Sequence, residues 1–383
     1  MSPRADQPSF TPEHRLTLLE TLLDRVPDFF YVHNAELRFQ YANRAAASYF
    51  GRPKSELPGL LHREVDDNPE QAAYFEAELI PIIERGEPVT TGDLPFTRGD
   101  GSPGLLQAHI VPFDHPVTGE RMMLGISRDV TEERRAAAER EARAAYEREL
   151  EIAHLVQRSL LPASPPEVVG FEIAARCEPA MYAGGDFYDF IVCPDGRMVA
   201  VLGDVTGHGV GPALIAASCR AYARAVVPRM SLTGSIKELD RLVTADAHDG
   251  SFVTFAAIEL TPGERTVRYC SAGHGPVAHV GHTGAVRVLP TQTLPLGLGI
   301  AAASAVEGLE LRVEAGERVL LPSDGLIESR GADGVQWGME RLAVACAGET
   351  AEEAVEQAYA ADEAWRGGTP ADDDQSLVVI GAS

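Results

Sequence analysis

The sequence predicts an α+β protein in which a long helix joins two domains. Residues 11–131 combine a short helical pattern with alternating strand-like runs, and residues 132–162 are rich in Ala, Glu, Arg and Leu, with no glycine or proline before Pro162. In residues 163–383, strand-like runs and helical runs each occur in adjacent pairs. Such pairs favour antiparallel sheets flanked by helices over a repeated strand-helix-strand unit. A chain of 383 residues is long enough for two domains with separate cores.

The composition is that of a globular protein, with 45% hydrophobic and 23% charged residues. The formal net charge of -24 argues against nucleic acid and anionic lipid as partners, because both require clustered Lys and Arg. The five cysteines are odd in number and lack a CxxC spacing, which indicates free thiols in a reducing compartment. The N-terminus has no apolar signal segment, and no run of ~18 apolar residues occurs. We therefore expect a cytoplasmic protein without a membrane partner.

The first unit, residues 11–131, is expected to fold as one α+β domain. A helical pattern covers residues 14–24, and strand-like alternation follows at residues 29–33 and 38–43. Polar turns such as RGDGS at residues 98–102 separate the later strands.

Four segments of this unit resemble a PAS sensory domain. They are VPDFFYVHNAELRFQYANRAAASYFG, SELPG, TRGDGSP and GISRDVTEER, and they follow one another in the order of that family. The resemblance implies a ligand-binding or dimerising module that receives a signal, and it leaves the ligand unknown. His33, His62 and His115 are candidate haem ligands, against the alternative that they are surface or hydrogen-bonded histidines. The absence of cysteine from this half argues against a flavin-adduct light sensor.

Residues 132–162 are expected to form one helix with a coiled-coil seam. The seam consists of apolar positions at heptad spacing, interrupted by Glu149: Ala138, Ala142, Ala145, Ile152 and Val156. Acidic and basic residues alternate beside these positions, as they do beside the seam of a coiled coil. A single solvated helix is the alternative, because the seam is rich in alanine. A parallel dimer is favoured, since a sensor needs a way to transmit strain to its output.

Four aspartates of the C-terminal unit stand where an apolar, strand-like run meets a glycine or a polar turn. They lie in GGDFYDF, VAVLGDVTGHG, VLLPSDGLIES and DDDQSLVVIG, and are Asp186, Asp204, Asp324 and Asp373. Taken singly, an aspartate beside glycine is more often a turn former than a ligand. No basic residue adjoins any of the four, however, and a strand end fixes a side chain well. Oxygen ligands without His or Cys suit Mg²⁺ or Mn²⁺ better than Zn²⁺, so the four acids predict a site for hard divalent cations.

The C-terminal unit also resembles the SpoIIE/RsbU-like PPM phosphatases, bacterial relatives of protein phosphatase 2C. The motifs GGDFYDF, GDVTGHGVGPAL, SFVTF, YCSAGHGP, LPLGL, LPSDGLIES and DDQSLVVI occur in the order of that family within residues 150–380. The resemblance implies an αββα sandwich that holds two Mn²⁺ or Mg²⁺ ions at its central sheets. The helix ending in LVQRSLLP is similar to the regulatory linker that precedes this domain in the family.

By the same resemblance, Asp204 bridges both ions, and the backbone carbonyl of Val205 completes the shell of the first ion. Asp324 and Asp373 hold the second ion, and Asp186 binds directly or through water. These four aspartates are also the expected catalytic residues. Two ions that share one water lower its pKa and present hydroxide in line with a phosphoester, so catalysis needs no phosphoenzyme.

Several further residues lie near these motifs. His208 and His274 could protonate the leaving oxygen, although a structural role is favoured because both lie between small residues in turns. The role of Asp374 stays open. Gln375 and Ser376 stand where the family more often has Ile-Thr, a substitution that keeps the hydroxyl and is expected to matter little. The metal motifs contain no arginine that could clamp phosphate, whereas eukaryotic relatives use one.

The resemblance implies hydrolysis of phosphoserine or phosphothreonine on an anti-sigma-factor antagonist, under the control of the PAS sensor. We also expect a homodimer formed through the PAS domain and the linker helix. The segment GGDFYDF resembles the GGDEF signature of diguanylate cyclases, but that function requires an acid at Phe187. A catalytically silent docking module is the other alternative, and the retention of all four acids argues against it.

Overall fold

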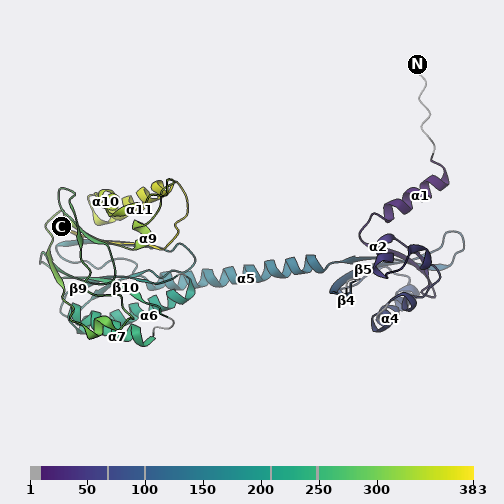
Figure 1. The fold of residues 1–383 in the computed structure, drawn as a ribbon, viewed down its shortest axis with the longest axis horizontal. Helices are drawn as coiled ribbons and strands as arrows, with labels where there is room; N and C mark the ends of the chain where they lie inside the picture. The colour runs from purple at the N-terminus through teal and green to yellow at the C-terminus, as the bar shows by residue number, and fades with distance from the viewer. Residues whose placement is uncertain (1–9, 67–68, 99–100, 208, 247–249) are drawn as a thin grey trace, which may run out of the picture. The chain divides into compact units, whose positions relative to one another are not determined.

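The computed structural model describes residues 10–66, 69–98, 101–207, 209–246 and 250–383. The chain divides into two compact units, Met1–Ala144 and Ala145–Ser383. The border between them lies within helix α5 (Thr131–Leu160), which Figure 1 shows as one continuous helix. Within the described ranges, no helix is both long and apolar enough to cross a membrane.

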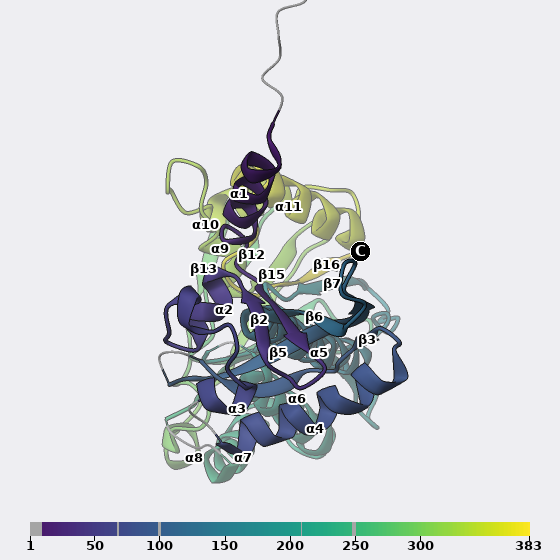
Figure 2. The same cartoon turned by 90° about the vertical axis from the view of Figure 1, so that its right-hand side faces the viewer.

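The N-terminal unit contains a six-stranded antiparallel sheet in the order β2-β1-β6-β5-β3, with β4 paired to β5. Its strands are β1 (Phe29–Asn34), β2 (Phe39–Ala42), β3 (Val89–Thr90), β4 (Leu94–Thr97), β5 (Pro103–Asp114) and β6 (Arg121–Asp129). The helices are α1 (Pro12–Leu23), α2 (Arg44–Tyr49), the 3₁₀ turn η1 (Lys54–Glu56), α3 (His62–Val65) and α4 (Pro69–Arg85). Figure 2 shows this sheet with α2, α3 and α4. The helix and the first two strands predicted for this unit are therefore present.

Asn43 explains how the chain turns from β2 into α2. Its side-chain oxygen accepts a hydrogen bond from the Ala46 amide (3.0 Å), which caps the helix, and its side-chain amide donates to the carbonyls of Leu23 and Asp28 (2.9 Å each). Asn43 is fully buried, so these bonds also tie the end of α1 to the sheet. None of the twelve residues of α1 is itself buried.

The three histidines considered as haem ligands lie in different environments. His115 accepts hydrogen bonds from the amides of Val117 and Thr118, as expected for a structural histidine. His33 and His62 are buried, and neither ring has a hydrogen-bond partner among the described residues. The expectation of surface or hydrogen-bonded histidines is therefore wrong for these two. Aromatic side chains surround them instead, with the Phe39 ring 4.2 Å from the His33 ring and 5.8 Å from the His62 ring between centroids.

The C-terminal unit contains two five-stranded antiparallel sheets. Sheet 1 has the order β14-β11-β10-β9-β8 and sheet 2 the order β13-β12-β15-β16-β7. Sheet 1 comprises β8 (Phe187–Val192), β9 (Met198–Val205), β10 (Val253–Leu260), β11 (Thr266–Ala272) and β14 (Leu309–Arg312). Sheet 2 comprises β7 (Phe171–Glu178), β12 (Val277–Val280), β13 (Val286–Leu289), β15 (Arg318–Pro322) and β16 (Gln375–Ala382). The helical segments are α6 (Val210–Val226), η2 (Val227–Arg229), α7 (Leu232–Asp246), α8 (Ile300–Ala303), α9 (Asp324–Ile327), α10 (Gly338–Ala345) and α11 (Ala351–Arg366).

These elements stack as four layers, with α6 and α7 on the outer face of sheet 1 and α10 and α11 on the outer face of sheet 2 (Figure 1). Three hydrophobic cores fill the spaces between successive layers. The αββα sandwich is thus confirmed.

Strand β9 shows why the sequences of the central strands are uninterrupted runs of apolar residues. Val199 and Val201 pack toward α6 and α7, whereas Ala200 and Leu202 pack between the two sheets. All four are fully buried because both faces of the strand are covered. Burying a polar group without a partner is costly, and Asp204, the acid of this strand, lies near the end of the strand.

Candidate metal centre

Sheet 1 supplies two of the predicted acids from the ends of adjacent strands. Asp204 lies near the end of β9, and Asp186 immediately precedes β8. The two strands are antiparallel, with Phe187 opposite Gly203, so the start of β8 lies beside the end of β9. This register brings Asp186 and Asp204 together.

Sheet 2 supplies the other two acids in the same manner. Asp324 follows β15 and begins α9, and Asp373 lies in the turn before β16. Strands β15 and β16 are antiparallel, with Pro322 opposite Leu377, so the end of one lies beside the start of the other. Each sheet therefore presents a pair of carboxylates at a paired strand end.

Two glycines of the sequence motifs allow the backbones to approach closely at this point. A Cβ atom at Gly185 would lie 2.5 Å from the carbonyl oxygen of Val205 and 3.1 Å from Oδ1 of Asp204. A Cβ atom at Gly325 would lie 2.2 Å from the carbonyl oxygen of Asp374. Neither distance to a carbonyl oxygen is compatible with a side chain. The glycines of GGD and SDG are thus required where these loops converge.

Asp374, whose role the sequence left open, joins the two sheets. Its Oδ1 accepts a hydrogen bond from the Ala180 amide (2.9 Å), and its Oδ2 accepts one from the Gly185 amide (2.7 Å). The loop that leads to Asp186 in sheet 1 is therefore held by a carboxylate at the start of a sheet 2 strand. The run of three aspartates was the only sequence signal for this residue.

The acids at this site destabilise one another's ionised forms. Burial is the largest cause that raises the pKa of Asp204, to about 7, followed by the charges of Asp324, Asp373 and Asp374. Burial, and then the charge of Asp204, raise the pKa of Asp186 well above its ordinary value. Burial and the charge of Asp373 raise the pKa of Asp324. A bound cation would therefore favour the ionised forms of these carboxylates.

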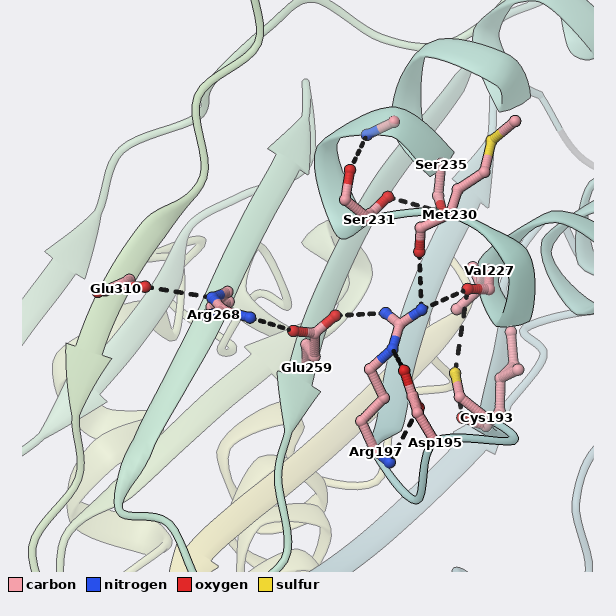
Figure 3. A network of polar contacts seen from close by, with 12 residues as sticks. Cys193, Asp195, Arg197, Val227, Met230, Ser231, Ser235, Glu259, Arg268 and Glu310 are labelled. Carbon is pink, nitrogen blue, oxygen red and sulfur yellow. Dashed lines mark hydrogen bonds and ion pairs between the residues drawn. The ribbon is translucent and has the colours of Figure 1, made fainter.

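The carboxylates buried elsewhere in this unit are compensated, by arginine for Asp189, Glu259 and Asp362 and by backbone amides for Asp240. Glu259 accepts hydrogen bonds from Arg197 (2.5 Å) and Arg268 (2.9 Å), as Figure 3 shows. Asp189, the second acid of GGDFYDF, accepts two from Arg224 (2.5 and 2.8 Å). In the described part of the chain, no Lys or Arg forms an ion pair with any of the site aspartates. This difference separates the acids that stabilise the fold from those available to a ligand.

The residues present suit a hard divalent cation. Every candidate donor is an oxygen, and Oδ2 of the buried Asp186 has no hydrogen-bond partner among the described residues. The side chains stand apart, since no three His, Cys, Asp or Glu in the described ranges are grouped as a metal would require. A bound cation would offset both the burial of these carboxylates and their mutual repulsion, the two causes that raise their pKa values.

His274 is placed for a structural role. It is buried, its Nε2 lies 3.0 Å from the carbonyl oxygen of Pro322, and its Nδ1 lies 2.9 Å from the Thr254 hydroxyl. A carbonyl only accepts, so Nε2 carries the proton and Nδ1 accepts from the hydroxyl. Burial lowers the pKa of His274 to about 4. The ring thus bonds sheet 1 to sheet 2 near the aspartates. His208, the other candidate acid, lies outside the described residues.

Gln375 has a more specific role than its motif indicated. It is buried, and its side-chain amide donates to Oδ2 of Asp362 on α11 (3.0 Å). Arg366 donates to the same oxygen (2.7 Å). An isoleucine, which the family more often has at this position, could not make this bond. Gln375 instead pairs with Asp362, a buried polar group on α11.

The last turns of α5 contact the loop that precedes Asp186. The Gln157 amide donates to the carbonyl of Gly184 (2.6 Å), and its side-chain oxygen accepts from the Gly184 amide (3.1 Å). A cavity of about 1130 Å³ lies beside this contact and reaches Asp186 and Asp374. The helical pattern alone gave no sign of which side chain of α5 would touch the domain.

An αββα sandwich with uncompensated carboxylates at paired strand ends is the architecture of PPM-type phosphatase domains. Residues 194–383 match the model of the Stage II sporulation protein E (SpoIIE) family, and residues 23–135 match the model of the PAS fold. The C-terminal half of the chain therefore belongs to the SpoIIE family, and it follows a PAS domain.

Curated relatives include two bacterial phosphatases. The chain is 29% identical to phosphoserine phosphatase RsbU of Bacillus subtilis (strain 168) over 188 residues, which is 49% of this chain and 55% of RsbU. It is 27% identical to phosphoserine phosphatase RsbP of the same strain over 192 residues, 47% of this chain and 45% of RsbP. The chain thus spans about half the length of these relatives.

Solved structures agree in fold. The RsbU and RsbW domains of Rv1364c from Mycobacterium tuberculosis match with a TM-score of 0.50 and 25% identity, over 58% of this chain and 63% of that one. The SiaA-PP2C domain of Pseudomonas aeruginosa matches with a TM-score of 0.54 and 20% identity, over 63% of this chain and 99% of that one.

Proposed function

We propose that this protein is a metal-dependent protein serine/threonine phosphatase whose activity is controlled by its PAS domain. The observation that carries the proposal is the set of four carboxylates at paired strand ends, none of which has a Lys or Arg partner among the described residues. Asp186 is buried and Asp204 half-buried, whereas the acids buried elsewhere in the unit are compensated by arginines or backbone amides. The family and the phosphoserine phosphatase relatives support the same chemistry.

Two Mn²⁺ or Mg²⁺ ions would supply a hydroxide nucleophile and neutralise the phosphate charge. Asp204 would bridge them, with the carbonyl of Val205 beside it. Asp324 and Asp373 would hold the second ion, and Asp186 would bind directly or through water. The chain's remaining contribution is positional, because the hydrogen bonds of Asp374 and His274 fix the loops from which these ligands project.

Helix α5 offers a physical route for control by the sensor. It begins at the end of the PAS sheet, and its Gln157 bonds both backbone groups of Gly184, two residues before Asp186. A rotation or shift of α5 would therefore move a ligand of the candidate metal centre. The two conformations needed for such a switch would differ in whether this contact is made.

The substrate that best fits the relatives is a phosphorylated anti-sigma-factor antagonist in a partner-switching pathway. An RsbU domain shares a chain with an RsbW domain in the Mycobacterium tuberculosis protein, which supports a role beside partner-switching proteins. A homodimer through the PAS domain and α5 would present two such phosphatase domains.

The test is hydrolysis of a phosphoserine peptide and of p-nitrophenyl phosphate by the full chain, with and without Mn²⁺. We expect Mn²⁺-stimulated release of phosphate that Asp204→Asn abolishes, because the bridging carboxylate is lost. Asp333→Asn, in an exposed turn, should retain it. Equal activity in Asp204→Asn and the parent chain would refute the proposal. An inactive parent that still binds a phosphoprotein would favour the docking module instead.

A further inference from the structure

We propose that the cavity beside α5 is the groove that binds the phosphorylated segment of the protein substrate, and that Arg158 of α5 binds its phosphate. The inference rests on the proposed phosphatase function and extends it to a residue outside the metal motifs. It also supplies the phosphate-binding arginine that those motifs lack.

The cavity lies between α5 and the segment that leads from β7 to β8. Its volume is about 1130 Å³, which exceeds what a single phosphorylated side chain fills. One wall is formed by Glu151, His154, Leu155 and Arg158, whose spacing places them on one face of the helix. This face differs from the predicted coiled-coil seam at Ile152 and Val156, so both surfaces can be used at once.

The same cavity is also lined by Asp186 and Asp374 of the candidate metal centre. Hydrogen bonds join α5 to the loop that carries these acids. Gln157, next to Arg158, bonds Gly184, and the following Gly185 amide bonds Asp374. Arg158 therefore lines the same cavity as two acids of the candidate metal centre, which is the placement that a phosphate-binding arginine requires.

Charge distinguishes Arg158 from the other cation of this cavity. Arg176 is already engaged, since it pairs with Glu178 and stacks over the Tyr359 ring at 4.4 Å. Arg158 is exposed, and its guanidinium forms no hydrogen bond or ion pair with any described residue. Glu151 is the acid that remains on the helix wall. In a chain of net charge -24, a guanidinium of this kind is a specific attractor for phosphate, which it can bind through two parallel N–H donors.

Apolar side chains at the rim indicate that the occupant is a polypeptide. Leu155 is 64% exposed, Met181 56% and Tyr182 41%, and all three line the cavity. A phosphoserine segment with apolar neighbours would cover these side chains while its phosphate reaches toward Arg158. Because Arg158 lies on α5, a movement of that helix would change substrate binding and the metal centre together.

The experiment compares full-length Arg158→Gln with Arg148→Gln, an exposed arginine on α5 that does not line the cavity. The substrate is a phosphoserine peptide with leucine on both sides of the phosphoserine, and inorganic phosphate is the competitive inhibitor. We expect Arg158→Gln to raise KM and the phosphate inhibition constant by about tenfold, the effect of losing one charge-assisted phosphate contact. Arg158→Lys should recover part of the loss, and the Mn²⁺ concentration for half-maximal activity should not change in any variant.

The possible outcomes distinguish the role of Arg158 from the proposed phosphatase activity. An active parent chain whose KM and phosphate inhibition constant are the same in Arg158→Gln and Arg148→Gln would overturn the inference alone. A raised Mn²⁺ requirement in Arg158→Gln would also overturn it, because the residue would then act on the metal centre and not on phosphate. A parent chain without Mn²⁺-dependent hydrolysis would refute the phosphatase proposal, and this inference with it.

Discussion

At the scale of single residues, the metal centre depends on a contrast between acids that are compensated and acids that are not. Asp189 and Glu259 are as buried as Asp186, but arginines neutralise them. A local motif cannot reveal this contrast, because the partners Arg224 and Arg197 are distant from those acids in sequence. It follows that removing the arginine partner of a buried acid should impair folding, whereas removing a site aspartate should impair metal binding.

His274 gives a residue-scale prediction for pH dependence. Its folded pKa of about 4 lies below the ordinary value of 6.5, so its neutral form stabilises the fold above pH 6.5, and this contribution is lost as pH falls toward 4. The loss amounts to at most about 3 kcal/mol, given 1.36 kcal/mol per pKa unit. His274→Gln should therefore show a shallower fall in thermal stability over this interval than the parent chain. The exposed His14→Gln serves as the control, and parallel pH profiles for His274→Gln and the parent would contradict the prediction.

At the scale of elements, helix α5 is both a connection and part of the active domain. The heptad spacing predicted its exposed apolar seam. The contact of Gln157 with Gly184 could not be predicted, because it depends on the position of a loop between two strands. The same reason explains Asp374 and Gln375, whose partners Gly185 and Asp362 come from other elements.

Replacing Gln157 tests this contact directly. Gln157→Ala removes two hydrogen bonds, each worth about 1 kcal/mol, from the loop that positions Asp186. We expect the Mn²⁺ concentration for half-maximal activity to rise roughly five- to tenfold, since a looser loop holds a ligand less well. Titrating Mn²⁺ against hydrolysis, and against heat in a calorimeter, would measure it. The neighbouring Ser159→Ala should behave as the parent chain, and an unchanged Mn²⁺ titration for Gln157→Ala would exclude the coupling.

At the scale of the whole molecule, the sequence was sufficient to predict the fold class and the strand ends at which the acids lie. Apolar runs such as that of β9 predicted the strands, and the glycines beside Asp186 and Asp324 predicted turns; that these glycines also allow two backbones to approach closely was visible only in the structure. The burial of His33 and His62 was not predicted, because both are polar residues that become enclosed by aromatic rings only in the folded domain. The sequence also could not show which α5 face meets the phosphatase domain, because one helix carries two functional faces.

The unused face of α5 leads to the prediction that the molecule is a dimer. Ile152 and Val156 are 61% and 56% exposed, and α1 likewise leaves Leu16 and Leu19 at 60% and 58%. Pairing two copies of α5 through the seam would remove this apolar surface from water, so light scattering should give twice the mass of the chain. Ile152→Glu should yield the monomer, because it places a charge in the seam, whereas Ala137→Glu, outside the seam, should remain dimeric. A parent chain whose mass stays that of a monomer at all concentrations would identify α5 as a single solvated helix.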